Sequence, residues 1–493
     1  EQRGAGLGAQ SHGRCLTVRV SANAGNLPQA PQAFSVAGLL PQSDVVLVMD
    51  RSGSMSLESA TPGVTKLEAL QNAANEFVDL LDLGGGHRLG LVQFQENLVP
   101  FTPPFDLQQL GSGNVGDAHG AINGMVTGGW TNIIAGVDEA ASQLDDLAPS
   151  FPRQAIVVFS DGKHNRPVAS DLNNIDATVQ TGGHSFYSVG FGTDVDDAIL
   201  TNVANNSGGI HVNEQDLNPL QLTKYFLTVG AQVHNMAVLA DPAFELGAGQ
   251  TAEVAVDVSV LDQSLTVAVN WTSSIAEDVT LALRAPDKTC DIPLTDHPGL
   301  QVRQGTAYKL IRVTLPYDCQ GSIMHQGRWT VQATPEGIRD RGKETVDIMV
   351  LGDSRLDLAA GFEFDKEQSR LYLFTSFLQD AKPLRDLKDA TLEARILPAL
   401  PNTGDSEKQD SLGKNWTLDG QKPAAREDRI KTIRFVDTGR DGDRRAGDGI
   451  YTAVLTLADW EPGLAQVRLV GTVPKGDLKL TREATASFYV PEP

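Results

Sequence analysis

Short apolar runs alternate with amphipathic segments between about residues 43 and 235 of the chain. Residues 66–83 and 133–147 carry apolar side chains at the spacing of one helix face, which predicts two helices there. The apolar runs are short and rich in valine, as expected of strands that are covered on both faces. These predicted strands lie at residues 45–49, 89–94, 155–159 and 186–189. Strands that alternate with helices predict an α/β domain with a doubly wound, mainly parallel sheet and helices on both faces, the Rossmann-like class.

The helical periodicity stops after about residue 235, and alternating strand patterns take its place. A first set of these patterns lies at residues 252–260, 265–271, 279–283, 308–315, 329–333 and 345–351. A second set lies at residues 390–396, 430–436, 451–457 and 465–473. Gly, Pro and Asp separate the patterns at intervals of about 10 residues, which is typical of β-sandwiches.

We therefore expect a multidomain chain in which an α/β domain precedes two all-β domains. The predicted domains are an α/β domain at residues 43–235, a β-sandwich at 236–351 and an immunoglobulin- or fibronectin-like β-sandwich at 352–493. Residues 1–42 form a Gly- and Ala-rich lead-in with one strand pattern, which either stands alone or joins the first sandwich. Residues 402–422 are polar and rich in Gly, Asp and Lys, which predicts a loop.

Three oxygen-bearing side chains follow the first predicted strand directly. Asp50, Ser52 and Ser54 form a D-x-S-x-S turn at its carboxyl end. Open α/β sheets bind ligands at the carboxyl ends of their strands. One carboxylate and two hydroxyls suit Mg²⁺, which prefers hard oxygen ligands and keeps several waters. Such a turn alone could equally cap the following helix, so a metal site needs further donors.

Two other loops offer such donors at the same edge of the predicted sheet. Thr131 stands in a Gly-rich approach to the helix at 133–147, with its hydroxyl near the start of that helix. Asp161 follows the strand at 155–159 in a Ser-Asp-Gly sequence. With the turn after the first strand, they predict a divalent-metal site for Mg²⁺, or alternatively for Mn²⁺ or Ca²⁺. The predicted ligands are Asp50, Ser52, Ser54, Thr131 and Asp161.

These five residues resemble the metal-ion-dependent adhesion site of the von Willebrand factor type A family. They match all five positions of that site, and the resemblance covers about residues 42–232. It implies that an ion sits at the top of the sheet, with direct contacts from Ser52, Ser54 and Thr131. Asp50 and Asp161 would often act through water, and a carboxylate of the ligand would complete the coordination. The physical chemistry agrees, because an ion with only two formal charges beside it keeps residual positive charge and takes an external Asp or Glu.

A segment with four aspartates joins two predicted strands of the second sandwich, at residues 437–451. Its candidate ligands are Asp437, Asp441, Asp443 and Asp448. Ca²⁺ accepts many oxygens in flexible geometry, so the segment could hold a structural calcium ion. It is not an EF-hand, because the terminal Glu is absent and the spacing differs. The other interpretation is a tight turn in which Asp and Gly bond to the local backbone, and both interpretations stay open.

The order of the predicted domains carries a second resemblance. With the Asp-rich segment, short strand motifs at residues 267–272, 281–287 and 327–331 look like the calcium-activated chloride channel regulators. In that family a von Willebrand type A domain is followed by a β-sandwich and a fibronectin- or immunoglobulin-like module. A zinc protease domain usually precedes them, but the sequence has no H-E-x-x-H motif, so the resemblance does not extend to self-cleavage.

The charge of the chain limits the kinds of partner it can bind, and its cysteines indicate the compartment in which it folds. The chain has 40 Lys and Arg against 62 Asp and Glu, a formal charge of −22, which disfavours nucleic acid and anionic lipid as main partners. Cys290 and Cys319 lie in one β-rich stretch with 28 residues between them and are a candidate disulfide, with two buried thiols as the alternative. Cys15 has no evident mate. A disulfide would indicate an oxidising compartment, either extracellular or periplasmic. No apolar run is long enough to predict a membrane span.

These observations predict a secreted or cell-surface protein that binds a partner by metal-dependent adhesion, through an exposed Asp or Glu carboxylate of that partner. Trp130 and His164 are candidate residues of the ligand rim. Packing within its loop would explain Trp130 equally well, and a polar loop histidine without a functional role is the favoured interpretation of His164. No nucleophile with an orienting base is evident, so we expect no enzyme. Two other functions stay open: a structural subunit of a surface or extracellular assembly, and a regulator of a membrane channel.

Overall fold

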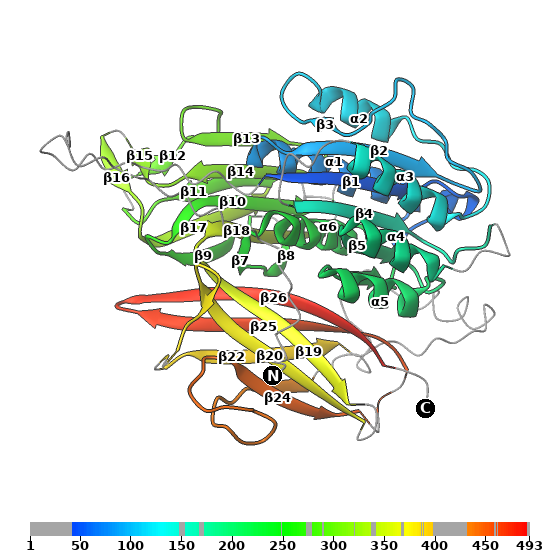
Figure 1. Ribbon diagram of the computed structural model, residues 1–493. Helices are drawn as coiled ribbons and strands as arrows, with labels where there is room; N and C mark the ends of the chain where they lie inside the picture. Colours follow the sequence, from blue (N-terminus) through cyan, green and yellow to red (C-terminus); the bar gives the residue numbers. More distant parts are fainter. Residues whose placement is uncertain are drawn as a thin grey trace, which may run out of the picture.

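The computed structural model describes residues 42–490 of the chain, except for several short segments and one longer one. The segments left out are 147–152, 167–171, 248, 273–278, 288–289, 320, 337–341, 366–368, 386, 388, 398–430, 458–459 and 461. The predicted lead-in strand and the predicted loop at residues 402–422 lie outside the described residues. Figure 1 shows an α/β part, coloured blue to teal, beside a green group of strands and above a yellow-to-red group. No helix within the described residues is long and apolar enough to cross a membrane.

Six strands form the sheet of the α/β part, in the order β3-β2-β1-β4-β5-β6. They are β1 (Ser43–Asp50), β2 (Arg88–Phe94), β3 (Gln108–Gln109), β4 (Arg153–Ser160), β5 (Ser185–Phe191) and β6 (His211–Glu214). All neighbours run parallel except β3, which is antiparallel to β2. The register pairs Val45 with Leu89 of β2 and with Ala155 of β4, so the strands end at the same edge. The prediction of a doubly wound, mainly parallel sheet is confirmed.

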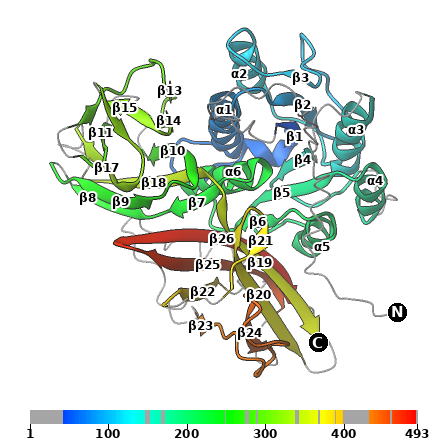
Figure 2. The same ribbon diagram turned by 60° about the vertical axis from the view of Figure 1, so that its left-hand side comes forward.

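Helices cover both faces of this sheet. Successive strand residues point to opposite faces, and in these strands both sets are apolar, so each face needs a cover. Leu47 of β1 belongs to the core on one face, and Val46 and Val48 belong to the core on the other. The first face is covered by α1 (Lys66–Gly84), α2 (Val115–Asn123) and α6 (Pro219–His234), and the second by α3 (Ile133–Asp146), α4 (Asn174–Gly182) and α5 (Asp197–Ser207) (Figure 2). The two helices predicted at 66–83 and 133–147 match α1 and α3 to within one residue.

The strands after α6 form one large sheet and several smaller ones. The large sheet has the order β13-β14-β10-β18-β7-β26-β25-β22-β23, and β8 also pairs with β18. Its first half comprises β7 (Ala237–Ala240), β8 (Ala243–Gly247), β10 (Asp262–Trp271), β13 (Leu300–Gln304), β14 (Tyr308–Thr314) and β18 (Lys343–Ser354). A second sheet consists of β12 (Asp291–Ile292), β11 (Val279–Arg284), β17 (Gly327–Pro335) and β9 (Ala252–Val258). Both sheets contribute to one core that contains the buried Trp271 and Trp329.

The other half of the large sheet belongs to the last part of the chain. It comprises β22 (Thr391–Leu397), β23 (Lys431–Arg434), β25 (Gly463–Lys475) and β26 (Leu478–Val490). A further sheet consists of β19 (Leu356–Asp365), β20 (Arg370–Gln379), β21 (Lys382–Pro383) and β24 (Tyr451–Thr456), and shares a core with it. β7 joins the two halves, and it pairs with β26 only through Val238 and Glu483. The region after α6 is therefore mainly strands, but one sheet runs through both predicted sandwiches, and their independence stays a prediction.

Helix α1 connects the α/β part to the first group of strands. The guanidinium of Arg303 in β13 donates from Nε and Nη2 to Oδ2 of Asp82, over 2.9 and 2.6 Å. The hydroxyl of Tyr308 in β14 donates to Oδ2 of Asp79 over 2.7 Å. Leu80 of the same helix packs into an apolar cluster shared with β10, β14 and β18. The last turns of α1 are thus fixed to this strand group by both polar and apolar contacts.

The α/β part also contacts the second group of strands. The hydroxyl of Tyr225 in α6 donates to Oε1 of Gln466 in β25 over 2.8 Å. Nε2 of Gln232, also in α6, donates to the carbonyl of Thr485 in β26 over 3.2 Å. Both views show α5 beside the end of β26 (Figures 1 and 2). The orientation of the α/β part is therefore restrained by both strand groups.

A buried ion pair ties the two strand groups to each other. Nη2 of Arg482 in β26 lies 2.6 Å from Oδ1 of Asp262 in β10, and neither side chain is exposed to solvent. The same guanidinium donates to the carbonyl of Leu356 and to the hydroxyl of Ser354, over 2.8 and 3.0 Å. Oδ2 of Asp262 accepts from the backbone amide of Ser259 over 2.7 Å. Removal of one partner would leave the other charge buried and unpaired, which is strongly destabilising.

Arg482→Met is expected to lower the free energy of unfolding by about 3–5 kcal/mol, because it leaves the buried carboxylate of Asp262 without its charged partner. The matched control is Arg355→Met, which removes an ion pair with Asp380 in which both side chains are about half exposed. That control should cost less than about 1 kcal/mol. Urea titrations followed by tryptophan fluorescence compare the two variants, and equal losses would contradict a special role for the buried pair.

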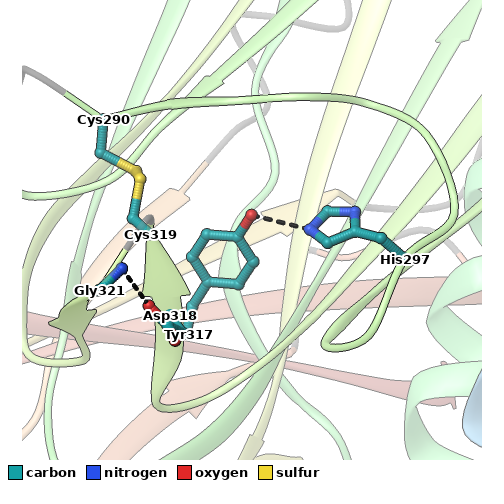
Figure 3. Close-up of a disulfide and its surroundings, with 6 residues drawn as sticks. All are labelled: Cys290, His297, Tyr317, Asp318, Cys319 and Gly321. Carbon is teal, nitrogen blue, oxygen red and sulfur yellow. Dashed lines mark hydrogen bonds between the residues drawn. A yellow bond between two sulfur atoms is a disulfide. The ribbon is translucent and has the colours of Figure 1, made fainter.

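The structure pairs Cys290 with Cys319 in a disulfide beside the hairpin of β15 (Tyr317–Cys319) and β16 (Ser322–Met324) (Figure 3). Cys290 is buried in the core of the first strand group. Next to the disulfide, the hydroxyl of Tyr317 and Nε2 of His297 lie 2.9 Å apart. The cross-link closes a loop with a sequence separation of 29 residues, which restricts the unfolded chain and thereby stabilises the folded one.

Alkylation of the denatured, unreduced protein is expected to label only one of the three cysteines, and reduction should expose all three. The double variant Cys290→Ala, Cys319→Ala should lose about 3–4 kcal/mol of unfolding free energy, as the length of the closed loop indicates. Mass spectrometry of the alkylated peptides and urea titration provide the two readouts. Three labelled cysteines before reduction would show that Cys290 and Cys319 are thiols.

Candidate metal centre

Asp50 lies at the carboxyl end of β1 and is fully buried. Its Oδ1 accepts a hydrogen bond from the backbone amide of Ser52 over 2.7 Å, and its Oδ2 accepts one from the hydroxyl of Ser160 over 2.6 Å. Ser160 is the last residue of β4, the strand that runs beside β1. Neighbours therefore hold both carboxylate oxygens, which fixes the orientation of the side chain.

The two serines of the turn and Asp161 form a continuous group of oxygens. The hydroxyl oxygens of Ser52 and Ser54 lie 3.0 Å apart, and the hydroxyl of Ser54 donates to Oδ1 of Asp161 over 2.8 Å. Asp161 follows β4 directly and is buried, whereas Ser54 lies in the short helix η1 (Gly53–Ser56) and is partly exposed. The structure thus brings predicted ligands from two separate loops into contact.

Thr131 lies at the same edge on a third loop, between α2 and α3. The backbone amide of Gly53 donates to the carbonyl of Gly129 over 3.0 Å, which ties this loop to the turn after β1. The amide of Thr131 donates to Oδ1 of Asn165 over 2.9 Å, which ties it to the segment after β4. Gly129 has a φ of +72°, a conformation that other residues adopt only with strain. These two hydrogen bonds bring all three predicted loops together at one edge of the sheet. Thr131 is buried there, with 3% of its surface exposed.

The centre concentrates negative charge in a buried place. Burial, and then the charge of Asp161, raise the pKa of Asp50 to about 7, although hydrogen bonds from two serines lower it. A divalent cation would offset both effects, because positive charge favours the ionised form of a carboxylate. Hydroxyl and carboxylate oxygens are also the donors that Mg²⁺ and Mn²⁺ prefer. The residues therefore fit a divalent ion, which Ser52, Ser54 and Thr131 would hold while the two aspartates supply charge.

Lys66 belongs to this centre, although the sequence interpretation missed it. Its Nζ lies 2.7 Å from Oδ2 of Asp161, with only 10% and 0% of the two side chains exposed. Lys66 is the first residue of α1, and a capping box of Thr65 and Glu68 fixes the start of that helix. The sequence did carry a signal for this role. A lysine at the start of a predicted helix is unfavourable, which indicates that a negatively charged partner lies nearby. Ser160 was missed too, although it stands in the quoted Ser-Asp-Gly sequence.

Exposed apolar side chains lie on the loops at this edge of the sheet. They are Leu57, Leu98, Val126 and Trp130, each at least 40% exposed. The guanidinium carbon of Arg166 lies 4.2 Å from the centre of the ring of Trp130, a favourable cation–π geometry. The backbone amide of His164 donates to Oδ2 of Asp196 over 3.0 Å. Trp130 is half exposed beside Thr131 and is therefore accessible to a partner.

The Asp-rich segment brings three of its four candidate ligands together. Carboxylate oxygens of Asp437, Asp443 and Asp448 lie within 4.8 Å of one another. Asp441 is not part of this group and is exposed. The carboxylates of Asp437 and Asp443 each accept two hydrogen bonds from backbone amides of the same segment. Such bonds are those that a tight turn requires, and the calcium interpretation stays a prediction.

Comparison with known proteins identifies the α/β part. Residues 44–224 match the profile of the von Willebrand factor type A domain, so the chain contains such a domain. Bovine (Bos taurus) inter-alpha-trypsin inhibitor heavy chain H4 is 27% identical over 212 residues, which are 41% of this chain and 21% of that protein. The chain therefore spans about a fifth of the length of this curated relative.

Solved structures show a weaker likeness. A von Willebrand factor type A protein from Catenulispora acidiphila is 14% identical with a TM-score of 0.35, and the match covers 68% of this chain and 64% of that one. Proximal thread matrix protein 1 from the mussel byssus, described with a zinc-occupied MIDAS motif, is 18% identical with a TM-score of 0.32. That match covers 39% of this chain and 46% of the mussel protein. Neither likeness carries an argument about function.

Asp50→Asn is expected to weaken the binding of Mg²⁺ and Mn²⁺ at least about 100-fold, because it removes half of the carboxylate charge of the centre. The amide keeps the size of the carboxylate, so far-ultraviolet circular dichroism should not change. Isothermal titration calorimetry measures the affinity, and Asp117→Asn, an exposed change in α2, is the matched control. Metal affinity in Asp50→Asn equal to that of the control would place the ion elsewhere.

Proposed function

We propose that this chain is a metal-dependent adhesion protein, which binds an acidic group of a partner protein through a divalent ion at the edge of its α/β sheet. The ion would be Mg²⁺ or Mn²⁺, held by Ser52, Ser54 and Thr131 with the charge of Asp50 and Asp161. The proposal includes all five positions of the metal-ion-dependent adhesion site, and it rests on the presence of the von Willebrand type A domain. Such domains commonly serve protein interaction.

The observation that carries the proposal is the contact between donors from different loops. The hydroxyls of Ser52 and Ser54 lie 3.0 Å apart, and Ser54 donates to Asp161 over 2.8 Å. Few carboxylates surround these hydroxyls, so a bound ion would keep residual positive charge and an affinity for an external carboxylate. The chain has a formal net charge of −22 and therefore repels acidic partners in general. A bound cation would give such a partner a local site of positive charge.

The apolar side chains on the surrounding loops indicate the kind of acidic group that fits. Trp130 and Leu57 are 51% and 57% exposed, on loops that also carry proposed ligands. Buried aromatic anchors contribute much of the binding energy of protein interfaces. A partner segment with an Asp or Glu flanked by apolar residues would satisfy both the ion and these side chains.

The proposed location is extracellular or at a cell surface. The disulfide of Cys290 and Cys319 supports it, because disulfides persist in oxidising compartments. The two strand groups would then present the metal centre as a pair of β-sandwich domains, without enzymatic activity of their own. A structural subunit, and the channel regulator that the domain order suggests, remain alternatives, but the metal centre does not specifically favour them.

Selection of peptides on the whole chain tests this function. A random peptide library is bound in the presence of Mg²⁺ and eluted with a chelator. We expect the eluted peptides to share an Asp or Glu flanked by apolar residues, since the carboxylate would bind the ion. Synthetic peptides with that residue changed to Asn or Gln should lose at least about tenfold in affinity, measured by fluorescence anisotropy.

Two variants of the chain are the controls for this selection. Asp50→Asn should not bind the selected peptides, and Trp130→Ala should bind them about tenfold more weakly, as expected for an aromatic anchor. Peptides that bind equally well in chelator, or equally well to Asp50→Asn, would contradict metal-dependent adhesion.

A further inference from the structure

The ammonium group of Lys66 lies inside the metal centre, where a further positive charge opposes a bound cation. Nζ is 2.7 Å from Oδ2 of Asp161, while Oδ1 of the same carboxylate accepts from the hydroxyl of Ser54 over 2.8 Å. Asp161 thus stands between the side-chain nitrogen of Lys66 and the hydroxyl of Ser54, a predicted metal ligand. A Cβ at Gly192, the residue after β5, would lie 3.8 Å from Nζ, so the end of that strand also borders the ammonium group.

This position is unfavourable for a lysine without a specific partner. Lys66 is the first residue of α1, where the positive end of the helix dipole repels a cation. The residue is only 8% exposed, so its charge has also lost most of its water. Within the described residues, the ion pair with Asp161 offsets these costs.

The pair changes the charge that the centre offers to a metal ion. Asp50 and Asp161 together supply two negative charges, and Lys66 reduces the sum to one. A protonated amine has no lone pair and cannot itself bind a metal. At short range and reduced dielectric, its repulsion of a divalent ion is substantial.

We propose that Lys66 sets the residual charge and the ion preference of the metal centre: it weakens binding of the ion alone and so leaves the ion a strong acceptor for a partner's carboxylate. Lys66 is a positioning residue that acts through Asp161. The inference deepens the proposed function and rests on it, since it presupposes that the centre binds a divalent ion.

A consequence for ion preference follows from the geometry of Asp161. Lys66 Nζ lies against Oδ2, whereas Oδ1 faces Ser54, a proposed ligand, so an ion beside the serines would meet Oδ1 first and the ammonium group would compete with it for Oδ2. Ca²⁺ takes six to eight oxygens and often binds a carboxylate through both of them, whereas Mg²⁺ needs fewer protein oxygens and keeps water. The lysine therefore favours Mg²⁺ or Mn²⁺ over Ca²⁺, and its removal should help Ca²⁺ most.

Calorimetric titration of the whole chain with Mg²⁺, Mn²⁺ or Ca²⁺ alone tests the inference. Lys66→Met keeps the length and apolar stem of the side chain without its charge. We expect this variant to bind Mg²⁺ at least roughly tenfold more tightly than the unchanged chain, with a larger gain for Ca²⁺. Lys66→Arg keeps the charge and should stay within about threefold of the unchanged chain.

The matched control is Lys163→Met. Lys163 stands two residues after Asp161, but it pairs over 3.5 Å with Asp194 and both side chains are largely exposed. Its removal should leave the metal affinities unchanged. If Lys66→Met does not fold, Lys66→Gln replaces it, because the amide is neutral and still able to donate to Asp161.

Urea unfolding of the Lys66 variants in the presence of a chelator distinguishes a purely structural role of this lysine from the proposed one. A lysine that only stabilises the fold would, when replaced, lower the urea midpoint and leave metal affinity unchanged or weaker, and that result would overturn the inference. Tighter binding in Lys66→Met but not in Lys66→Arg supports it. Absence of metal binding by the unchanged chain would instead refute the proposed function, and the inference with it.

Discussion

Two buried carboxylates at the ends of adjacent parallel strands place the strongest constraint on this molecule. Asp50 ends β1 and Asp161 follows β4, and both side chains are buried, where negative charge is costly unless it is paired or hydrogen-bonded. The chain surrounds them with donors: the hydroxyls of Ser160 and Ser54, and the ammonium group of Lys66. The loops and the start of α1 thus surround the two acidic side chains with donors, and a divalent ion would compensate their charge further.

Helix α1 links this centre to the rest of the chain. Its first residue, Lys66, pairs with Asp161, and its later turns carry Asp79 and Asp82, which bind Tyr308 and Arg303 of the first strand group. The strand groups are in turn joined through β7 and through a buried ion pair between β10 and β26. The candidate metal centre is therefore held on a framework that connects it to both strand groups, and this framework would fix the orientation of an ion presented to a partner.

The α/β fold could be predicted because its signals are local. Val-rich runs mark strands covered on both faces, and apolar spacing marked α1 and α3 to within one residue. The D-x-S-x-S turn directly follows such a strand, so the sheet itself determines where its side chains lie. Lys66 was missed because its meaning depends on a partner 95 residues away. In the same way, no local pattern indicates that β7 pairs with β26, or that Arg482 is buried against Asp262, since these contacts join distant parts of the sequence.

The position of the ion is the most direct test of this account. Crystals of the whole chain grown with Mn²⁺ would be measured at the manganese absorption edge, so that anomalous scattering locates the metal. The account predicts a peak about 2.0–2.6 Å from the hydroxyl oxygens of Ser52 and Ser54, with Lys66 still paired to Asp161. No peak beside these hydroxyls, at Mn²⁺ concentrations that saturate binding in solution, would contradict it.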